Sequence, residues 1–409
     1  MSAWETDDDS FKSGGAGAEV RSGGLMSAER IYLDHAAGGA LLPAVQKEML
    51  RYLVGIQASP GGGHREGREA REELEKARQR VATFLGAKDM EGVIFTSGGT
   101  EAVQSAIRGW GEAVQNGTIY VSEMEHPAVE SAVRTLGKRG FTLVRVPVDA
   151  EGRLKWGEVK VEKDKGLVCV HLAHHDLGTV QKIAEARKFA DRVGAKLFVD
   201  ATHGAGWVSF SVEESGADLV ALSGHRLGGP KGSGALWIRS GTAWAAWLEG
   251  GRQEGDRRAG TENLPAIVGL GVAVEEWGKK GEAFRKEAGG AQKLFWHGVQ
   301  KKVGIAKLHG APLGAERNPA HLAVSFAGLE AEALALVLDR VGLAVRGGSG
   351  CVTREMRVPP GMKAIGATAE EARALILFTL GWNCGEGWTG EAADRVAQGV
   401  KRLTEALSA

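Results

Sequence analysis

Polar side chains that could take part in chemistry follow several predicted strands of this chain, at the points where those strands end. Each comes after an apolar run typical of a buried parallel strand. Because ligands bind beyond the carboxyl ends of strands in an open parallel sheet, we expect these side chains to meet at one rim. They are His126, His175, Asp200, His203, Ser223, His225 and Arg226. One such residue alone is more often structural, but a set at successive strand ends favours a binding or catalytic site.

A turn of small residues, Ser97 to Glu101, lies between a predicted strand ending at Thr96 and a predicted helix from Ala102 to Trp110. Backbone N–H groups at a helix N-terminus bind phosphate well. Such turns are common between strands and helices, so this signal is weak by itself. It nevertheless makes Gly99 and Thr100 candidate phosphate-binding residues.

The middle of the chain alternates short apolar, β-branched runs with longer amphipathic stretches, which predicts an α/β fold with a mostly parallel sheet. A helix over 66–85 carries apolar residues at helical spacing, a pattern typical of packing rather than of function. The expected strands cover 92–96, 118–122, 142–146, 167–172, 196–200, 218–222 and 234–239.

A charged helical stretch from Glu275 to about Val299 is expected to lead out of this domain. Beyond it, strands over 322–326 and 343–346 and helices over 330–341 and 368–379 predict a smaller α+β domain. The expected division is a disordered tail (1–25), a segment joining the small domain (26–45), the large α/β domain (46–285) and the small C-terminal α+β domain (286–409).

Composition limits the classes of partner. The 409 residues contain 51 Lys plus Arg and 51 Asp plus Glu, so no net charge favours nucleic acid or an anionic membrane. Three cysteines are too few for a disulfide framework and fit a reducing compartment. The first 25 residues lack the basic start and apolar run of a secretory signal. We therefore expect a cytoplasmic protein whose partners are small molecules and proteins.

In order and spacing, these segments resemble the motifs of the cysteine desulfurases, class V aminotransferases that use pyridoxal phosphate. The resemblance runs from Tyr32-Leu33-Asp34-His35-Ala36-Ala37 to about Gly381. It implies a type I pyridoxal-phosphate-dependent transferase fold. The stretch Ala221 to Gly232 resembles the segment that carries the family's cofactor-binding lysine.

The resemblance implies a role for each strand-end residue. His126 would stack on the cofactor's pyridine ring, and Asp200 would pair with its ring nitrogen, which keeps the ring protonated and able to accept electrons. The phosphate would be held by Gly99, Thr100, Ser223 and His225. A loop from Gly250 to Asn263 resembles the one that reaches a neighbouring subunit's phosphate site, which implies a homodimer with Thr261 acting in trans.

The motif Arg346-Gly347-Gly348-Ser349-Gly350-Cys351 resembles the loop whose cysteine takes sulfur from L-cysteine as a persulfide and passes it to an acceptor protein. A thiol in an exposed, glycine-rich loop near arginines is also a candidate for a lowered pKa. By contrast, Cys169 lies inside an apolar run and is expected in the core, and Cys384 has no motif.

Four departures from the family pattern fall inside the expected site. Arg226 stands where the family has the lysine that forms a Schiff base with the cofactor, and a guanidinium offers no free amine for that bond. His175 and His203 stand where an asparagine and a glutamine would contact the cofactor's ring hydroxyl, and Leu377 stands where an arginine would bind the substrate carboxylate. Lys231, five positions beyond Arg226, is not expected to replace the missing amine.

Three functions stay open at this point. In the first hypothesis, the chain is a cysteine desulfurase that uses Cys351 and tolerates Arg226. In the second, it is a catalytically degenerate relative that carries sulfur or serves as a scaffold for sulfur-transfer or iron–sulfur partners. A third reading takes four histidines, His126, His175, His203 and His225, with Asp176 or Asp200 as a zinc or iron pocket, although no ligand spacing is diagnostic. We expect no metal in the preferred readings.

Overall fold

The computed structural model describes residues 30–55, 58–162, 165–348 and 358–409. The expected tail (1–25) and Cys351 lie outside the described residues. None of the helices within the described part combines the length and the apolar character needed to cross a bilayer.

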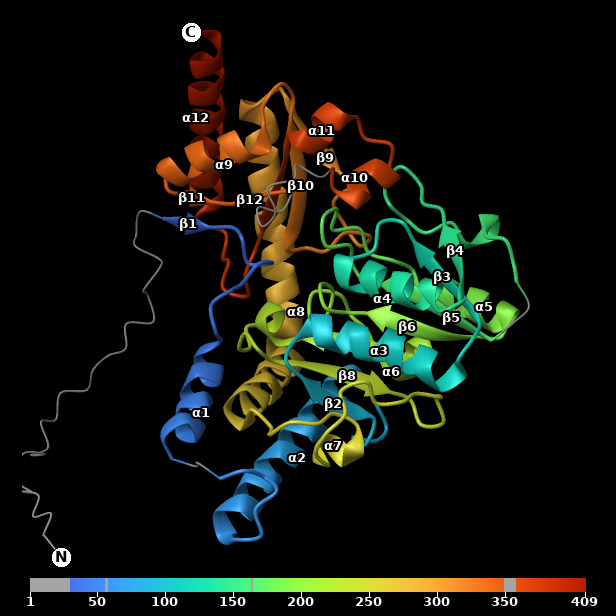
Figure 1. Ribbon diagram of the computed structural model, residues 1–409. Helices are drawn as coiled ribbons and strands as arrows, with labels where there is room; N and C mark the ends of the chain where they lie inside the picture. Colours follow the sequence, from blue (N-terminus) through green and yellow to red (C-terminus); the bar gives the residue numbers. More distant parts are fainter. Residues whose placement is uncertain (1–29, 56–57, 163–164, 349–357) are drawn as a thin grey trace, which may run out of the picture.

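A seven-stranded sheet forms the centre of the larger part of the molecule (Figure 1). Its spatial order is β2-β8-β7-β6-β5-β3-β4; β4, β3, β5, β6 and β7 run parallel, and β8 is antiparallel to both β7 and β2. All seven predicted strands are confirmed, with ends that shift by at most one residue. Their bounds are β2 Val93–Thr96, β3 Thr118–Ser122, β4 Thr142–Val146, β5 Gly166–His171, β6 Ala195–Asp200, β7 Leu219–Ser223 and β8 Gly234–Ile238.

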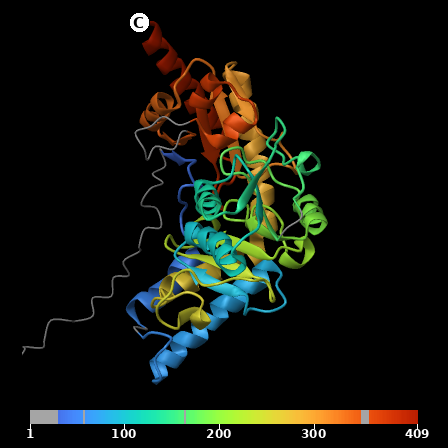
Figure 2. The ribbon, with the colours of Figure 1, turned by 45° about the vertical axis from the view of Figure 1, so that its right-hand side comes forward.

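Helices cover both faces of this sheet (Figure 2). Alternate strand residues divide between two apolar clusters: Cys169 and Phe198 pack with α3 and α4 on one face, whereas Val168 and Leu197 pack with α5 and other helices on the opposite face. This burial on both faces explains why the sequences of the strands are continuous apolar runs. The helices are α1 Pro43–Val54, α2 Arg65–Leu85, α3 Gly99–Val114, α4 Pro127–Lys138, α5 Ile183–Val193, α6 Val212–Ser215 and α7 Gln253–Asp256, with 3-10 turns η1 Trp156–Glu158 and η2 Gly224–Leu227.

The long helix α8, Leu264–Lys302, runs from the larger part of the molecule into the smaller one (Figure 1). The smaller part contains a four-stranded sheet in the order β12-β13-β10-β9 and a two-stranded sheet of β1 and β11. The bounds are β1 Ile31–Tyr32, β9 Ala306–His309, β10 His321–Phe326, α9 Ala331–Arg340, β11 Leu343–Ala344, β12 Arg346–Gly347, α10 Pro360–Ala364, α11 Ala369–Arg373, β13 Leu375–Thr379 and α12 Thr389–Ser408. The α/β class and the presence of both sheet systems agree with the predicted fold; the domain boundaries stay a prediction.

Two predicted elements differ from the structure. The strand expected over 343–346 is divided into β11 and β12, which belong to different sheets. The helix expected over 368–379 is only one turn long, α11, and the chain then enters β13. All five residues of β13 are buried, and the strand pairs with β10 on one side and β12 on the other. A short apolar run has no periodicity that separates a buried strand from a helix, so pairing in the fold decided its structure.

Candidate active site

The ends of three neighbouring parallel strands form the centre of the candidate site. The sheet register pairs His171 with Asp200 and Asp200 with Ala221, so the segments that follow β5, β6 and β7 leave the sheet side by side. The 3-10 turn η2 follows β7 directly and carries Arg226. These pairings place the predicted side chains of three separate segments at one rim.

Three of the predicted histidines lie around one another. The ring centroids are 5.1 Å apart for His126 and His175, 5.5 Å apart for His175 and His203, and 5.9 Å apart for His126 and His203. Burial lowers the pKa of all three histidines, and the positive charge of Arg226 adds to this effect. At neutral pH the three rings are therefore uncharged.

Hydrogen bonds fix the orientation of the histidine that would stack on a cofactor. His126 caps α4, since its Nδ1 accepts from the backbone N–H of Ala128 at 3.1 Å. The proton of the neutral ring is then on Nε2. Proline at the first position of α4 gives no N–H there, so the cap satisfies the next donor of the helix.

A cluster of His174, His175 and Asp176 brings one possible ligand atom from each residue within 4.8 Å of the others. His174, however, has no ring nitrogen to spare: Nδ1 accepts from the backbone N–H groups of Asp176 and Leu177, and Nε2 donates to the carbonyl oxygen of Met124 at 2.6 Å. A metal would have to displace these bonds. The hydrogen bonding of His174 therefore weighs against the metal reading at this cluster.

Asp200 is held by its neighbour in sequence. One carboxylate oxygen, Oδ1, accepts from the backbone N–H of Thr202 at 2.9 Å and from its hydroxyl at 2.6 Å. The residue is 4% exposed. Its position at the end of β6 and these two bonds fix the carboxylate, and Oδ1 already has two donors, which leaves Oδ2 for a ligand.

Three of the four predicted phosphate-binding residues, Gly99, Thr100 and His225, line an open pocket of about 320 Å³ at the start of α3, whereas Ser223 is not among its lining residues. Ser97, Gly98, Gly99, Thr100, Glu101, His225 and Lys231 are among its lining residues. A Cβ at Gly99 would lie 2.8 Å from Cγ2 of Thr202 and 3.1 Å from Cβ of Ser223, so this position tolerates only glycine without movement. Beside it, Ser223 Oγ lies 3.1 Å from Nδ1 of His225.

Charge around this pocket is mixed. Glu101 accepts from the backbone N–H of Ser97 at 2.8 Å and pairs with Arg258 at 2.8 Å, which balances its charge. Lys231 is exposed at the pocket. The helix N-terminus and the lysine together favour an anionic group here.

Arg226 is within electrostatic range of two carboxylates and a second arginine. Its pKa is lowered to about 9, chiefly by burial and also by the positive charge of Arg346, while the negative charges of Asp200 and Asp34 act in the opposite direction. A group with this pKa is still protonated at pH 7. Within the described residues Arg226 makes no hydrogen bond or ion pair, so its charge is available to a ligand. It also lines a narrow cavity of about 40 Å³ that His203, His225 and His321 border.

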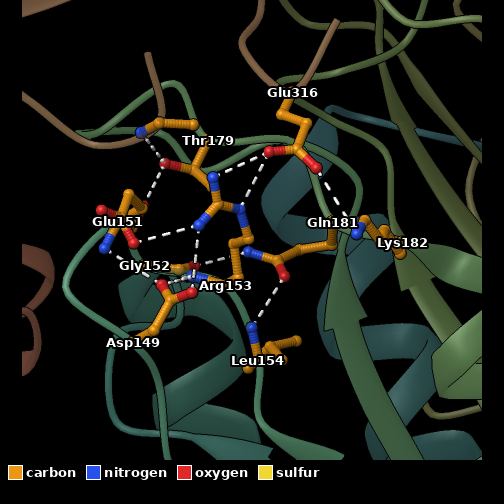
Figure 3. Close-up of polar contacts among 10 residues, drawn as sticks. Asp149, Glu151, Gly152, Arg153, Leu154, Thr179, Gln181, Lys182 and Glu316 are labelled. Carbon is orange, nitrogen blue, oxygen red and sulfur yellow. Dashed lines mark hydrogen bonds and ion pairs between the residues drawn. The ribbon is translucent and has the colours of Figure 1, made fainter.

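A network of polar contacts holds the loop after β5 in place (Figure 3). Arg153 donates to Asp149 at 3.1 Å, to Glu151 at 3.0 Å and to Glu316 at 2.7 Å. Thr179 donates to the carbonyl oxygen of Glu151 at 2.6 Å. These contacts join three loops, and the segment that carries His174 to Asp176 is thereby fixed from its far end.

Beneath the site lies a buried chain of hydrogen bonds that the sequence did not reveal. Glu125 accepts from the Ser122 hydroxyl and from Nδ1 of His171, both at 2.9 Å. Gln181 lies 3.1 Å from Nε2 of His171, and its own carbonyl oxygen accepts from the N–H of Leu154. The amide therefore donates to His171, whose proton is on Nδ1. In the sequence, the only indication of a role for Glu125 was its position next to His126. The local sequence pattern did not indicate a contact between Glu125 and His171.

Other predicted residues lie apart from this centre. Thr261 is exposed on the loop before α8 and is not among the residues that line the pocket at α3, so its action in trans stays a prediction. Cys169 is buried in β5, as expected, and burial raises its pKa. Cys384 is half-buried and its pKa is raised to about 11, which argues against a reactive thiolate.

Comparison with known proteins gives the family. The model of the family described as Aminotransferase class-V matches residues 31–373. The chain is 36% identical over 359 residues to a cysteine desulfurase IscS of Dictyoglomus turgidum, with 86% of this chain and 89% of that protein covered. It is also 36% identical over 387 residues to the putative cysteine desulfurase IscS 1 of Bacillus subtilis, with 92% and 100% covered.

Solved structures show the same fold. A structure described as a NifS-like protein aligns with a TM-score of 0.83 at 28% identity and covers 92% of this chain and 99% of its own. A structure described as SspA in complex with cysteine aligns with a TM-score of 0.74 at 26% identity and covers 85% and 98%. The chain therefore spans nearly the whole length of the proteins it resembles.

Proposed function

Because the chain belongs to the cysteine desulfurase family, within the class V aminotransferases, we propose that it is a sulfur-transfer protein without the family's covalent cofactor chemistry. In this proposal its pocket holds pyridoxal phosphate and an amino acid without a covalent bond between cofactor and chain. Cys351 carries sulfur. Pyridoxal phosphate is the cofactor of this family, and its fit can be judged group by group from the residues present.

The residues fit the phosphate and the ring. The open pocket at the start of α3 offers backbone N–H groups and Lys231, and the glycine at position 99 lets Thr202 and Ser223 pack against the start of this helix. Asp200 is a buried, fixed carboxylate of the kind that pairs with a ring nitrogen, and His126 is oriented by its cap. When bound, the cofactor supplies an electron sink for bonds at the amino acid's α-carbon.

The residues do not fit covalent attachment, and this single observation carries the proposal. Arg226 lies at the family's lysine position, beside Asp200, and its guanidinium remains charged at neutral pH. It provides neither an amine for a Schiff base nor a base that can take a proton from the substrate. Lys231 lines the phosphate end of the pocket and not the end at Asp200.

Cysteine as the amino acid is supported by the likeness to a structure described as a complex with cysteine. The role of Cys351 as the sulfur carrier rests on its sequence motif. Its thiolate would attack the outer sulfur of a persulfide on a donor protein, so that a new S–S bond forms on Cys351 and the donor leaves as a thiolate. The thiolate of an acceptor protein would then take the outer sulfur in the same way. A homodimer and a cytoplasmic location remain predictions.

The covalent bond is tested by trapping. The purified protein is loaded with pyridoxal phosphate, reduced with borohydride and analysed by mass spectrometry. We expect no cofactor adduct on the natural chain and complete loss of the cofactor on dialysis, whereas Arg226→Lys should form an adduct at position 226. An adduct on any residue of the natural chain, Lys231 included, overturns the proposal.

Turnover is tested separately. Alanine formed from L-cysteine should not exceed that of a control with free pyridoxal phosphate. A persulfide donor should label the natural chain and not Cys351→Ala, detected as a mass increase of one sulfur atom. Alanine formation above the control that Cys351→Ala abolishes would instead identify a desulfurase.

A further inference from the structure

Arg346 lies directly opposite Leu377 across two antiparallel strands. In the pairing of β12 with β13, these two residues are Cα partners. Residues opposite each other in a sheet project their side chains from the same face, with Cβ atoms about 4.5–5.5 Å apart. The family's arginine for the substrate carboxylate is expected at position 377, where this chain has leucine. A guanidinium on residue 346 therefore starts one strand away from that position and on the same face.

This face of the small sheet lies against the candidate site. Leu377 packs in one buried cluster with Met124 and Leu177. Met124 is two residues before His126, and Leu177 directly follows Asp176. The side chains on this face thus point towards the two segments that carry the site histidines.

Asp34 lies on the same edge of β13 as Arg346, because β10 occupies the other edge and pairs His321 with Thr379. It forms an isolated parallel bridge with Thr379, two residues along β13 from Leu377, so both residues of β13 face the same way. Oδ1 of Asp34 is buried and has no hydrogen-bond partner within the described residues. The positive charge of Arg346 opposes the effect of burial, which raises the pKa of Asp34. An arginine and an aspartate therefore lie along one edge of β13 at the site.

Arg346 is half-buried and has no hydrogen bond or ion pair of its own within the part of the chain that the structure describes. Its charge nevertheless reaches the site: it lowers the pKa of Asp176 against the effect of burial, and it adds to the lowering of the pKa of His126. A guanidinium that is partly removed from water gains most from a bidentate carboxylate.

We propose that Arg346 binds the carboxylate of the amino acid ligand and so replaces, from the neighbouring strand, the arginine that the family has at the position of Leu377. This assignment rests on the proposed function, since it takes an amino acid as the ligand. Arg346 acts as a specificity-determining residue, because it separates amino acids from amines that lack the carboxylate.

The test uses two ligands that differ only in the carboxylate: S-methyl-L-cysteine and 2-(methylthio)ethylamine. Binding of each to the full-length protein loaded with pyridoxal phosphate is measured by calorimetry. The natural protein should prefer S-methyl-L-cysteine by about ten- to a hundredfold, the range of a charge-assisted hydrogen bond. Arg346→Gln should lose that preference and bind the amine unchanged, and Arg346→Lys should keep part of it.

Two further variants serve as controls. Arg340→Gln removes an exposed arginine at the end of α9 and should bind both ligands like the natural protein. The exchange Arg346→Leu with Leu377→Arg moves the cation back across the strand pair and should restore the preference. If the exchanged chain does not fold, Arg346→Gln and Arg346→Lys still decide the assignment.

Three outcomes would overturn the assignment: no preference in the natural protein, an unchanged preference in Arg346→Gln, or weaker binding of pyridoxal phosphate by Arg346→Gln than by the natural protein, which would assign Arg346 to the cofactor. Each is separate from the trapping result. A borohydride adduct on the natural chain would overturn the proposed function and leave the role of Arg346 to the binding data.

Discussion

At the scale of single residues, the buried carboxylate of Glu125 is the strongest prediction for stability. It accepts from Ser122 and His171 and is 2% exposed. Glu125→Ala leaves both donors buried without an acceptor and opens a cavity, so it should lower the free energy of unfolding by about 2–4 kcal/mol. Urea denaturation followed by fluorescence measures this loss.

The neighbouring Glu123 provides the matched control because it is exposed. Glu123→Ala should change the free energy of unfolding by less than about 0.5 kcal/mol. Equal losses for the two variants would mean that the chain from Ser122 to Gln181 does not contribute to stability.

The sequence predicted a good part of the candidate site at this scale, because a strand end marks the edge of a parallel sheet. His126, His175 and His203 do lie around one another. It did not place Arg346 against the site, since that position depends on the register between β12 and β13. Register joins residues distant in sequence, and local pattern carries no information on it.

At the scale of elements, one buried ion pair fixes the loop that precedes α8. Glu254 accepts from Arg78 of α2 at 2.7 and 2.9 Å and from the backbone N–H of Phe95 in β2 at 3.0 Å. Glu254→Ala removes both hydrogen bonds of this pair and leaves the buried guanidinium with Glu75, at 3.0 Å, as its remaining ionic partner, so it should lower the free energy of unfolding by about 3 kcal/mol. The double variant Arg78→Met with Glu254→Ala should cost much less than the sum of the two single changes.

A double-mutant cycle in urea measures this coupling. The exposed pair of Arg65 and Glu69 on the same helix is the control, and Glu69→Ala should cost less than about 1 kcal/mol. Additive losses at Arg78 and Glu254 would show that the pair does not couple α2 to the loop.

Elements differed in how well the sequence specified them. The seven strands of the large sheet are bounded by turns and helices that make their limits readable, and all were predicted. The run Leu375 to Thr379 was predicted as helix, yet it is β13. A run of five buried apolar residues is compatible with a helix or with a strand. This run forms a strand because β10 and the short β12 offer edges with which it can pair.

At the scale of the whole molecule, buried histidines predict a loss of stability in acid. Burial lowers the pKa of His35, His225 and His321 to about 4. Unfolded histidines titrate near 6.5, so between pH 6.5 and 4 the unfolded chain binds protons that the folded chain does not. The free energy of unfolding should therefore fall as the pH drops through this window, by at most about 1.4 kcal/mol per pH unit for each histidine.

Asp176 has the opposite effect on how the free energy of unfolding depends on pH, and a variant of this residue can therefore test the prediction. Burial raises its pKa to about 7, while Arg346 partly offsets the shift; His174, His175 and His321 are its other titratable neighbours. Between pH 4 and 7 the folded chain thus holds a proton that the unfolded chain has lost, so this residue lowers stability as pH rises. Asp176→Asn should raise the free energy of unfolding at pH 8, by at most about 4 kcal/mol, and the gain should vanish near pH 4. Urea denaturation of both proteins from pH 4 to 8 tests this prediction. Because several histidines outweigh one aspartate, both proteins should lose stability as the pH falls, and the variant should lose it more steeply. Parallel curves of stability against pH would show that Asp176 is ionised in the folded chain throughout this range.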